Sequence, residues 1–221
     1  MIQIIPAILA TTEVEYLEFI NKINSSNLNG IDWIHIDLMD NIFVPNESIS
    51  SGITAHSLKS FKKEAHVMVK NFKFWIQELE KVEFDRIIIH YEADEEDQIR
   101  DGLMFLKGKN IQAGLAINPE TPVNSVIPFL KDIDVLLIMG VHPGFQGQKF
   151  IPETLKKIKE CSRLRSNNNY SFKIEVDGGI SEENIKQGAD IGADIAVIGS
   201  ALFKYGNLED GMEKIREAQD G

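Results

Sequence analysis

The sequence predicts an α/β fold, a (β/α)8 TIM barrel that forms a single domain over residues 1–221. Two observations lead to this prediction. Short β-rich runs alternate with helical stretches about eight times, and most runs are continuous β-branched or aliphatic residues, as expected for parallel strands covered on both faces. Eight such units close most economically into a barrel. An open doubly wound sheet is the alternative, but its glycine fingerprint after the first strand is absent.

Each element is predicted from its own pattern. The first helix, for example, has apolar residues at helical spacing at Val14, Leu17 and Ile20. Strands are predicted over residues 2–9, 31–38, 65–69, 86–90, 111–117, 134–139, 172–176 and 194–198. Helices are predicted over residues 13–25, 54–61, 72–81, 95–107, 122–130, 152–164, 181–189 and 208–218.

Composition restricts the class of partner. Lysine and arginine number 23 against 34 acidic residues, a net charge of −11 that disfavours nucleic acid and anionic membranes as partners. The single cysteine, Cys161, cannot form an internal disulfide, which favours a reducing compartment. The first residues lack a basic leader, and no apolar run approaches the ~20 residues of a membrane span. We therefore expect a cytoplasmic protein that binds neither nucleic acid nor a membrane.

Polar side chains interrupt the second predicted strand. Residues two apart share one face of a strand, so His35, Asp37 and Met39 point the same way. His66 and Asp177 lie near the ends of two other strands. A lone strand histidine is more often a hydrogen-bonded core residue, and a lone aspartate is often a helix cap. Four such groups at the mouth of a barrel, where active sites sit, predict a divalent metal site, because unpaired buried carboxylates and imidazoles are costly.

Two glycine-rich segments follow the last two strands. Gly178 and Gly179 end the seventh strand, and Gly199 and Ser200 follow the eighth. Barrels often bind phosphate between these two loops through backbone N–H groups, so the pair predicts a phosphorylated substrate. The loop over residues 143–148, with glycine hinges and one aromatic, is predicted to be a mobile lid, with a plain surface loop as the alternative.

Several segments also resemble a known family. Residues 35–40 and 43–46 are similar to the HxDxMD…FVPN signature of ribulose-phosphate 3-epimerases. Further similar segments follow in the same order at residues 118–122, 141–150, 175–180 and 199–200. The resemblance covers nearly the whole chain, and its motifs are specific.

The resemblance implies a metal-dependent isomerase. One divalent ion (Zn, Fe, Mn or Co) would be bound by His35, Asp37, His66 and Asp177, with Asp37 and Asp177 also forming the acid/base pair. The implied substrate and phosphate contacts are His66, Gly144, Phe145, Gln146, Gly147, Gly178, Gly179, Gly199 and Ser200. The implied lining of the pocket is Ala7, Met39, Met68 and Met139, although the methionines are equally explained as ordinary core residues. A homo-oligomer is expected.

The implied reaction is epimerisation at C3, from D-ribulose 5-phosphate to D-xylulose 5-phosphate, a step of the pentose phosphate pathway. Two carboxylates on opposite sides of a planar enediolate would remove and return the proton. The sequence departs from the family pattern at Ala7, Asn41, Gly140 and Gln146. An epimerase for a six-carbon ketose phosphate such as allulose 6-phosphate therefore stays open, as does a non-catalytic sugar-phosphate-binding barrel. Orotidine-phosphate-type decarboxylases need a strand lysine that the second strand lacks.

Overall fold

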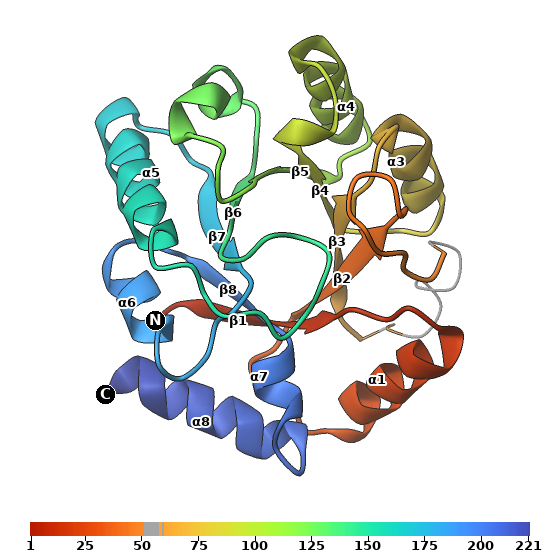
Figure 1. Ribbon diagram of the computed structural model, residues 1–221, viewed down its shortest axis with the longest axis vertical. Helices are drawn as coiled ribbons and strands as arrows, with labels where there is room; N and C mark the ends of the chain where they lie inside the picture. The colour runs from red at the N-terminus through yellow and green to blue at the C-terminus, as the bar shows by residue number, and fades with distance from the viewer. Residues whose placement is uncertain (51–57, 59) are drawn as a thin grey trace.

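The strands form one closed parallel barrel with the helices outside it (Figure 1). The computed structural model describes residues 1–50, 58 and 60–221. The strands are β1 (Gln3–Ile8), β2 (Trp33–Met39), β3 (Lys62–Met68), β4 (Arg86–His90), β5 (Gln112–Ile117), β6 (Val135–Met139), β7 (Lys173–Asp177) and β8 (Ile195–Ile198). They pair in sequence order, and β1 pairs with β8 to close the barrel. The predicted (β/α)8 barrel is confirmed.

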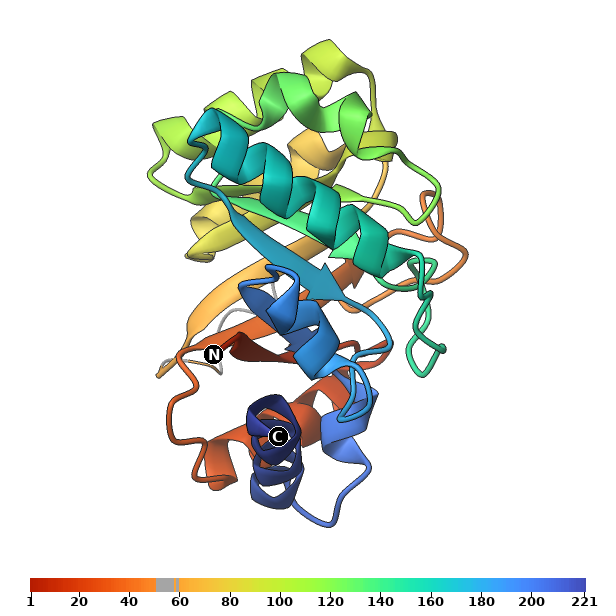
Figure 2. The ribbon, with the colours of Figure 1, turned by 90° about the vertical axis from the view of Figure 1, so that its left-hand side faces the viewer.

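The helices cover the outer face of the barrel, as the turned view shows for α5 (Figure 2). The α-helices are α1 (Glu13–Ser25), α3 (Phe72–Lys81), α4 (Glu96–Gly108), α5 (Thr154–Asn168), α6 (Ile185–Asp190), α7 (Ser200–Phe203) and α8 (Leu208–Asp220). Two 3-10 helices, η1 (Tyr91–Ala93) and η2 (Val123–Phe129), follow β4 and β5. Within the described residues, no helix combines the length and apolarity needed to cross a membrane.

Two helix predictions need correction. Residues 122–130 were expected to form an α-helix, but η2 is a 3-10 helix with Pro128 inside it. Proline has no N–H group to donate along the helix, and its ring clashes with the preceding turn, so a regular α-helix is disfavoured there. The helix expected over residues 181–189 begins only at Ile185. Most of the helix expected over residues 54–61 lies outside the described residues.

Helix α1 shows how local sequence sets an element. Thr12 accepts a hydrogen bond from the Glu15 backbone N–H at 3.2 Å, and the Glu15 carboxylate accepts one from the Thr12 N–H at 3.2 Å. This capping box satisfies two N–H groups that the helix cannot pair internally. The apolar face then buries Tyr16, Ile20 and Ile23 against the barrel.

The interior of the barrel is divided between apolar and polar layers. One buried apolar cluster inside it includes Ile5, Trp33, Ile88, Leu137 and Ile195. Strands β2 and β4, which contribute to this cluster, also carry buried polar side chains. Strand register aligns His35 with Glu64, Glu64 with Arg86, and Arg86 with Gln112 across β2 to β5. The alternation of strand residues therefore stacks polar side chains in successive layers toward the mouth of the barrel.

Candidate active site

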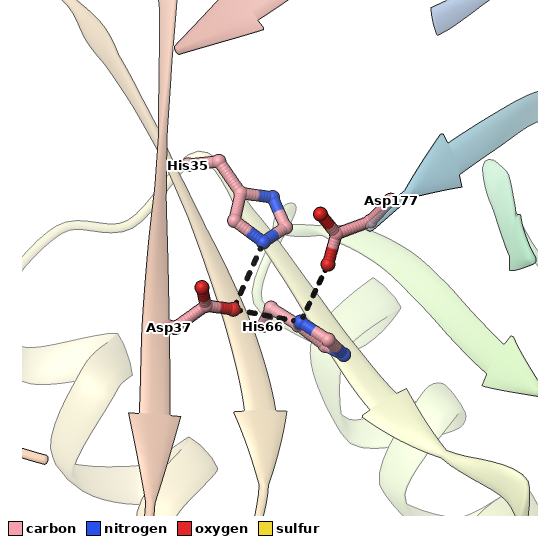
Figure 3. Close-up of side chains that lie close together, drawn as sticks. All are labelled: His35, Asp37, His66 and Asp177. Carbon is pink, nitrogen blue, oxygen red and sulfur yellow. Dashed lines mark hydrogen bonds and ion pairs between the residues drawn. The ribbon is translucent and has the colours of Figure 1, made fainter. Parts of the chain in front are cut away.

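Four side chains from β2, β3 and β7 converge at the mouth of the barrel (Figure 3). We call His35, Asp37, His66 and Asp177 the His/Asp cluster. Oδ1 of Asp37 lies 3.3 Å from Nε2 of His35 and 2.9 Å from Nδ1 of His66. Nδ1 of His66 is also 3.6 Å from Oδ2 of Asp177. Each residue offers one ligand atom, and these atoms all lie within 4.8 Å of one another. The structure thus brings together the four residues that the sequence singled out.

The two aspartates of this cluster differ in acidity. Burial raises the pKa of Asp177 to about 6, and the charge of Asp37 contributes to the rise. Burial also opposes ionisation of Asp37, but hydrogen bonds from His35 and His66 outweigh it and lower the pKa of that carboxyl. One carboxylate is therefore firmly ionised while the other gains a proton readily. Such separation is typical of paired acid and base groups.

In His35 and in His66, the ring nitrogen that points away from Asp37 also has a hydrogen-bond partner. Nδ1 of His35 lies 2.5 Å from Oε1 of Glu64, so it donates its proton there and leaves Nε2 facing Asp37. Nε2 of His66 lies 2.8 Å from Nε2 of His90, whose Nδ1 lies 3.2 Å from a Glu92 carboxylate oxygen. Burial lowers the pKa of His90 to about 4, so this imidazole is neutral and donates from Nδ1 to Glu92. His66 therefore donates from Nε2 to His90.

The donor set and its spacing test whether the cluster fits a metal ion. Nδ1 of His66 lies 2.9 Å from Oδ1 of Asp37 and 3.6 Å from Oδ2 of Asp177. Two imidazole nitrogens and two carboxylates are the donor set of zinc, iron, manganese or cobalt sites. The residues fit a divalent cation.

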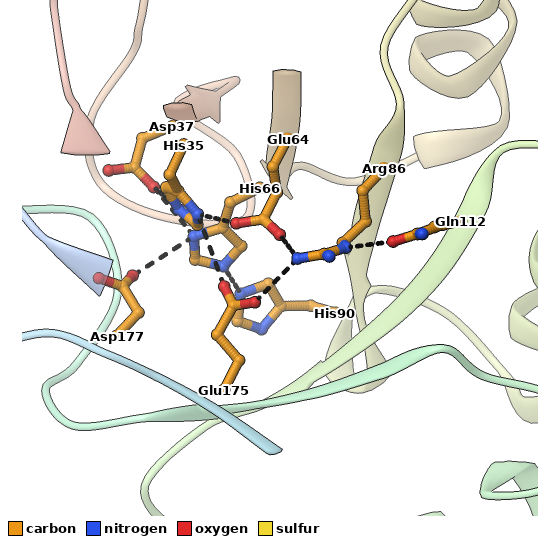
Figure 4. Close-up of polar contacts among 9 residues, drawn as sticks. All are labelled: His35, Asp37, Glu64, His66, Arg86, His90, Gln112, Glu175 and Asp177. Atoms are coloured by element: carbon orange, nitrogen blue, oxygen red, sulfur yellow. Dashed lines mark hydrogen bonds and ion pairs between the residues drawn. The ribbon is translucent and has the colours of Figure 1, made fainter. Parts of the chain in front are cut away.

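Below the His/Asp cluster lies a second polar layer, which we call the lower layer (Figure 4). It consists of Glu64, Arg86, Gln112 and Glu175. No role was predicted from the sequence for any of these residues or for His90. Spacing is a signal for two of them: Glu64 precedes His66 by two residues, and Glu175 precedes Asp177 by two, so each pair shares one face of its strand. Burial and the neighbouring Glu64 raise the pKa of Glu175 well above its usual value.

A pocket that is open to solvent lies above the His/Asp cluster. Asp37 and Asp177 form part of its floor. Of the other residues predicted from sequence, its lining includes Ala7, Met68, Met139, Gly144, Phe145, Gln146, Gly147, Gly178, Gly179, Gly199 and Ser200. His35, His66 and Met39 are not among the lining residues, and each is 0% exposed. His66 therefore lies beneath the pocket, behind the two aspartates.

The loop after β6 covers this pocket and is tied to the loop after β2. The Asn46 side-chain amide donates a hydrogen bond to the Gly144 carbonyl at 2.9 Å. Gln148 donates from Nε2 to the carbonyls of His142 and Phe145 at 2.6 and 2.8 Å, which holds the loop in a compact turn. The loop has the position of a lid, and its mobility stays a prediction.

Two of the unusual residues have a structural explanation. A Cβ atom on Gly140 would lie 2.3 Å from the Gly178 carbonyl oxygen, so a side chain there requires the ends of β6 and β7 to separate. Asn41 has φ of 55°, a left-handed conformation that asparagine tolerates better than most residues. Asparagine can therefore occupy a position where glycine is usual.

Comparison with known proteins decides the family. The model of the ribulose-phosphate 3 epimerase family matches residues 3–203. The chain belongs to this family. A ribulose-phosphate 3-epimerase of Methanocaldococcus jannaschii is 37% identical over 221 residues, covering 99% of this chain and 91% of the relative. That of Bacillus subtilis is 32% identical over 219 residues, covering 98% and 99%. This member of the ribulose-phosphate 3-epimerase family is an isomerase-class enzyme.

Solved structures of low sequence identity share the barrel of this family member. A 3-hexulose-6-phosphate synthase from Salmonella typhimurium superposes with a TM-score of 0.70 at 17% identity, covering 99% of this chain and 98% of that one. A 3-keto-L-gulonate-6-phosphate decarboxylase from Vibrio cholerae gives 0.73 at 13% identity, covering 99% and 97%. At such identities the likeness shows the fold alone.

Proposed function

We propose that this enzyme epimerises C3 of a ketose phosphate, interconverting D-ribulose 5-phosphate and D-xylulose 5-phosphate. One observation carries the proposal: two aspartates of different acidity face each other at the floor of a pocket, braced by two buried histidines (Figure 3). The names of the curated relatives support this substrate.

Asp37 and Asp177 would move the proton. They come from β2 and β7, which are separated in the barrel by β1 and β8, and their carboxylates point toward one another. A substrate carbon between them presents one face to each carboxylate. One carboxylate removes the C3 proton to give a planar enediolate, and the other returns a proton to the opposite face. In the reverse direction the two exchange roles.

His35, Asp37, His66 and Asp177 would hold one divalent cation. Bound there, the cation supplies Lewis-acid stabilisation of the negative charge that develops on the substrate oxygens. The histidines keep their coordinating nitrogens aimed at the aspartates through Glu64 and His90. Met68 and Met139 line the pocket beside them and exclude water without offering a proton.

The loops after β7 and β8 would hold the phosphate. Gly178 and Gly179 have φ of 102° and 69°, which glycine adopts without strain. A Cβ on Gly179 would lie 2.5 Å from the backbone nitrogen of Phe150, so the close approach of this loop also requires glycine. Together with Gly199 and Ser200 the loop lines one side of the pocket, where backbone N–H groups can bind an anion.

The experiment that tests this function measures turnover of ribulose 5-phosphate and allulose 6-phosphate side by side, with and without chelator. We expect efficient turnover of ribulose 5-phosphate that chelator suppresses. Preference for allulose 6-phosphate would make the six-carbon reaction the correct one. Binding of either sugar phosphate without turnover by metal-loaded protein would mean a non-catalytic barrel and contradict the proposal.

Ala7 offers a second test of the substrate. It lines the pocket in register with His35, where the family pattern has a serine. We expect Ala7→Ser to improve kcat/KM for ribulose 5-phosphate by up to roughly tenfold, because a neutral hydrogen bond contributes about 0.5–1.5 kcal/mol. Ala189→Ser, on helix α6 outside the pocket, is the control. No gain from Ala7→Ser would indicate a pocket organised around alanine for another ligand.

A further inference from the structure

A buried guanidinium lies in the lower layer, beneath the His/Asp cluster (Figure 4). Arg86 is 2% exposed, and its Nη1 donates to Glu64 and, at 3.3 Å, to Oε2 of Glu175. Its Nε donates to Oε1 of Gln112 at 2.9 Å. The guanidinium carbon lies 4.1 Å from the ring centroid of Trp33. Contacts with four side chains therefore fix its position.

Glu64 connects this guanidinium to the candidate metal site. One of its carboxylate oxygens accepts from Arg86, and the other lies 2.5 Å from Nδ1 of His35. The His35 ring cannot turn without breaking that contact. Its opposite nitrogen, Nε2, consequently stays 3.3 Å from Oδ1 of Asp37.

We propose that Arg86 is a positioning residue: it holds Glu64, and Glu64 holds His35 with Nε2 aimed into the His/Asp cluster. This inference rests on the proposed function and deepens it. It names what orients one of the four metal ligands. Partners of this kind set the tautomer and direction of a ligating imidazole, and their loss typically lowers metal affinity 10–100-fold.

Arg86 also explains why we expect one bound divalent ion and not two. His35, Glu64 and Glu175 form a second set of three donor atoms within 4.8 Å of one another in the described structure. The guanidinium contacts both glutamates of that set, so the protein supplies the positive charge there itself. A divalent ion is thereby confined to the upper set. Arginine suits this role because Nη1 donates to both glutamates while Nε donates to Gln112 and the guanidinium plane stacks on Trp33, a combination that a lysine ammonium cannot make.

The test uses two variants. Arg86→Lys keeps the charge but removes the planar guanidinium, and the double variant Arg86→Gln/Glu64→Gln removes both members of the Arg86–Glu64 ion pair together. The control is Arg165→Lys, because Arg165 forms a partly buried ion pair with Asp194, away from the cluster. Three quantities are measured: the Co²⁺ dissociation constant, the His35 Nδ1–H proton signal in metal-free protein by NMR, and the melting temperature.

We expect both Arg86 variants to bind Co²⁺ 10–100-fold more weakly and to shift the His35 Nδ1–H signal. Arg165→Lys should leave the Co²⁺ affinity and the His35 Nδ1–H signal unchanged, even if it lowers the melting temperature. A folded Arg86 variant with parental Co²⁺ affinity and an unshifted signal would overturn the positioning role. Wild-type protein that binds no Co²⁺ would instead contradict the metal part of the proposed function, and the NMR signal alone would then decide the role of Arg86.

Discussion

Replacing Asp37 or Asp177 by asparagine is expected to lower net epimerisation at least about a hundredfold, since general acid/base groups typically contribute 10²–10⁴-fold. Asparagine is the sharper probe than alanine because its amide oxygen still coordinates a cation but cannot act as a base. The two variants should lose solvent exchange of the C3 proton for different epimers. With Asp37→Asn, one epimer loses solvent exchange of its C3 proton; with Asp177→Asn, the other epimer loses it.

Deuterium incorporation from heavy water, followed by NMR from each epimer separately, distinguishes the two faces. Metal content is measured on the same samples. Asp190→Asn is a suitable control, because this carboxylate lies on helix α6 in an exposed pair with Lys186 at 3.9 Å. Near-parental epimerisation by both cluster variants with metal retained would rule out the two-carboxylate mechanism.

Removal of the divalent ion is expected to abolish nearly all activity, at least about a hundredfold, because Lewis-acid stabilisation of a developing charge is worth several kcal/mol. Protein purified without chelator should contain about one equivalent of metal. Adding Zn²⁺, Mn²⁺, Fe²⁺ or Co²⁺ to chelator-treated protein should restore turnover. Circular dichroism of the treated protein checks that it remains folded.

Metal affinity should fall as the pH falls. Burial lowers the pKa of His35, but hydrogen bonds to Asp37 and Glu64 outweigh it and raise that pKa well above its usual value. A proton therefore competes with the cation for Nε2 of His35, and below about pH 6 Asp177 gains a proton as well. Calorimetric titrations across pH measure this competition. Metal content well below one equivalent, with activity insensitive to chelator and to added metal, would contradict the metal site.

The fold was predictable because each strand–helix unit carries its own local pattern. The apolar runs that predict β4 over residues 86–90 match the structure at both ends. Errors arose where tertiary packing or a single residue overrides the pattern. Pro128 changes the type of helix η2, and the start of α6 moves to Ile185 after a turn. Helix propensity does not predict where a helix begins or ends, because capping residues and contacts with the barrel determine those positions.

The candidate site was predictable only in its upper layer. His35 and Asp37 were recognisable because alternation places them on one face of a strand, and the structure brings His66 and Asp177 to the same point. The lower layer was missed for a physical reason. Which residues of neighbouring strands stand level depends on the stagger of the barrel, as in the alignment of Glu64 with Arg86. A single sequence does not specify that stagger.

The two-layer stack in the barrel has a consequence for protein engineering. Grafting His35, Asp37, His66 and Asp177 onto another barrel would transfer the proposed metal ligands without the residues that hold them in position. The transplantable unit also includes Glu64, Arg86 and His90, and it spans β2 to β4 together with β7. Strand β7 is far from strands β2 to β4 in the sequence, so these residues cannot be transferred as one continuous segment. A host scaffold must reproduce the stagger of this barrel before the grafted chemistry is held with sufficient precision.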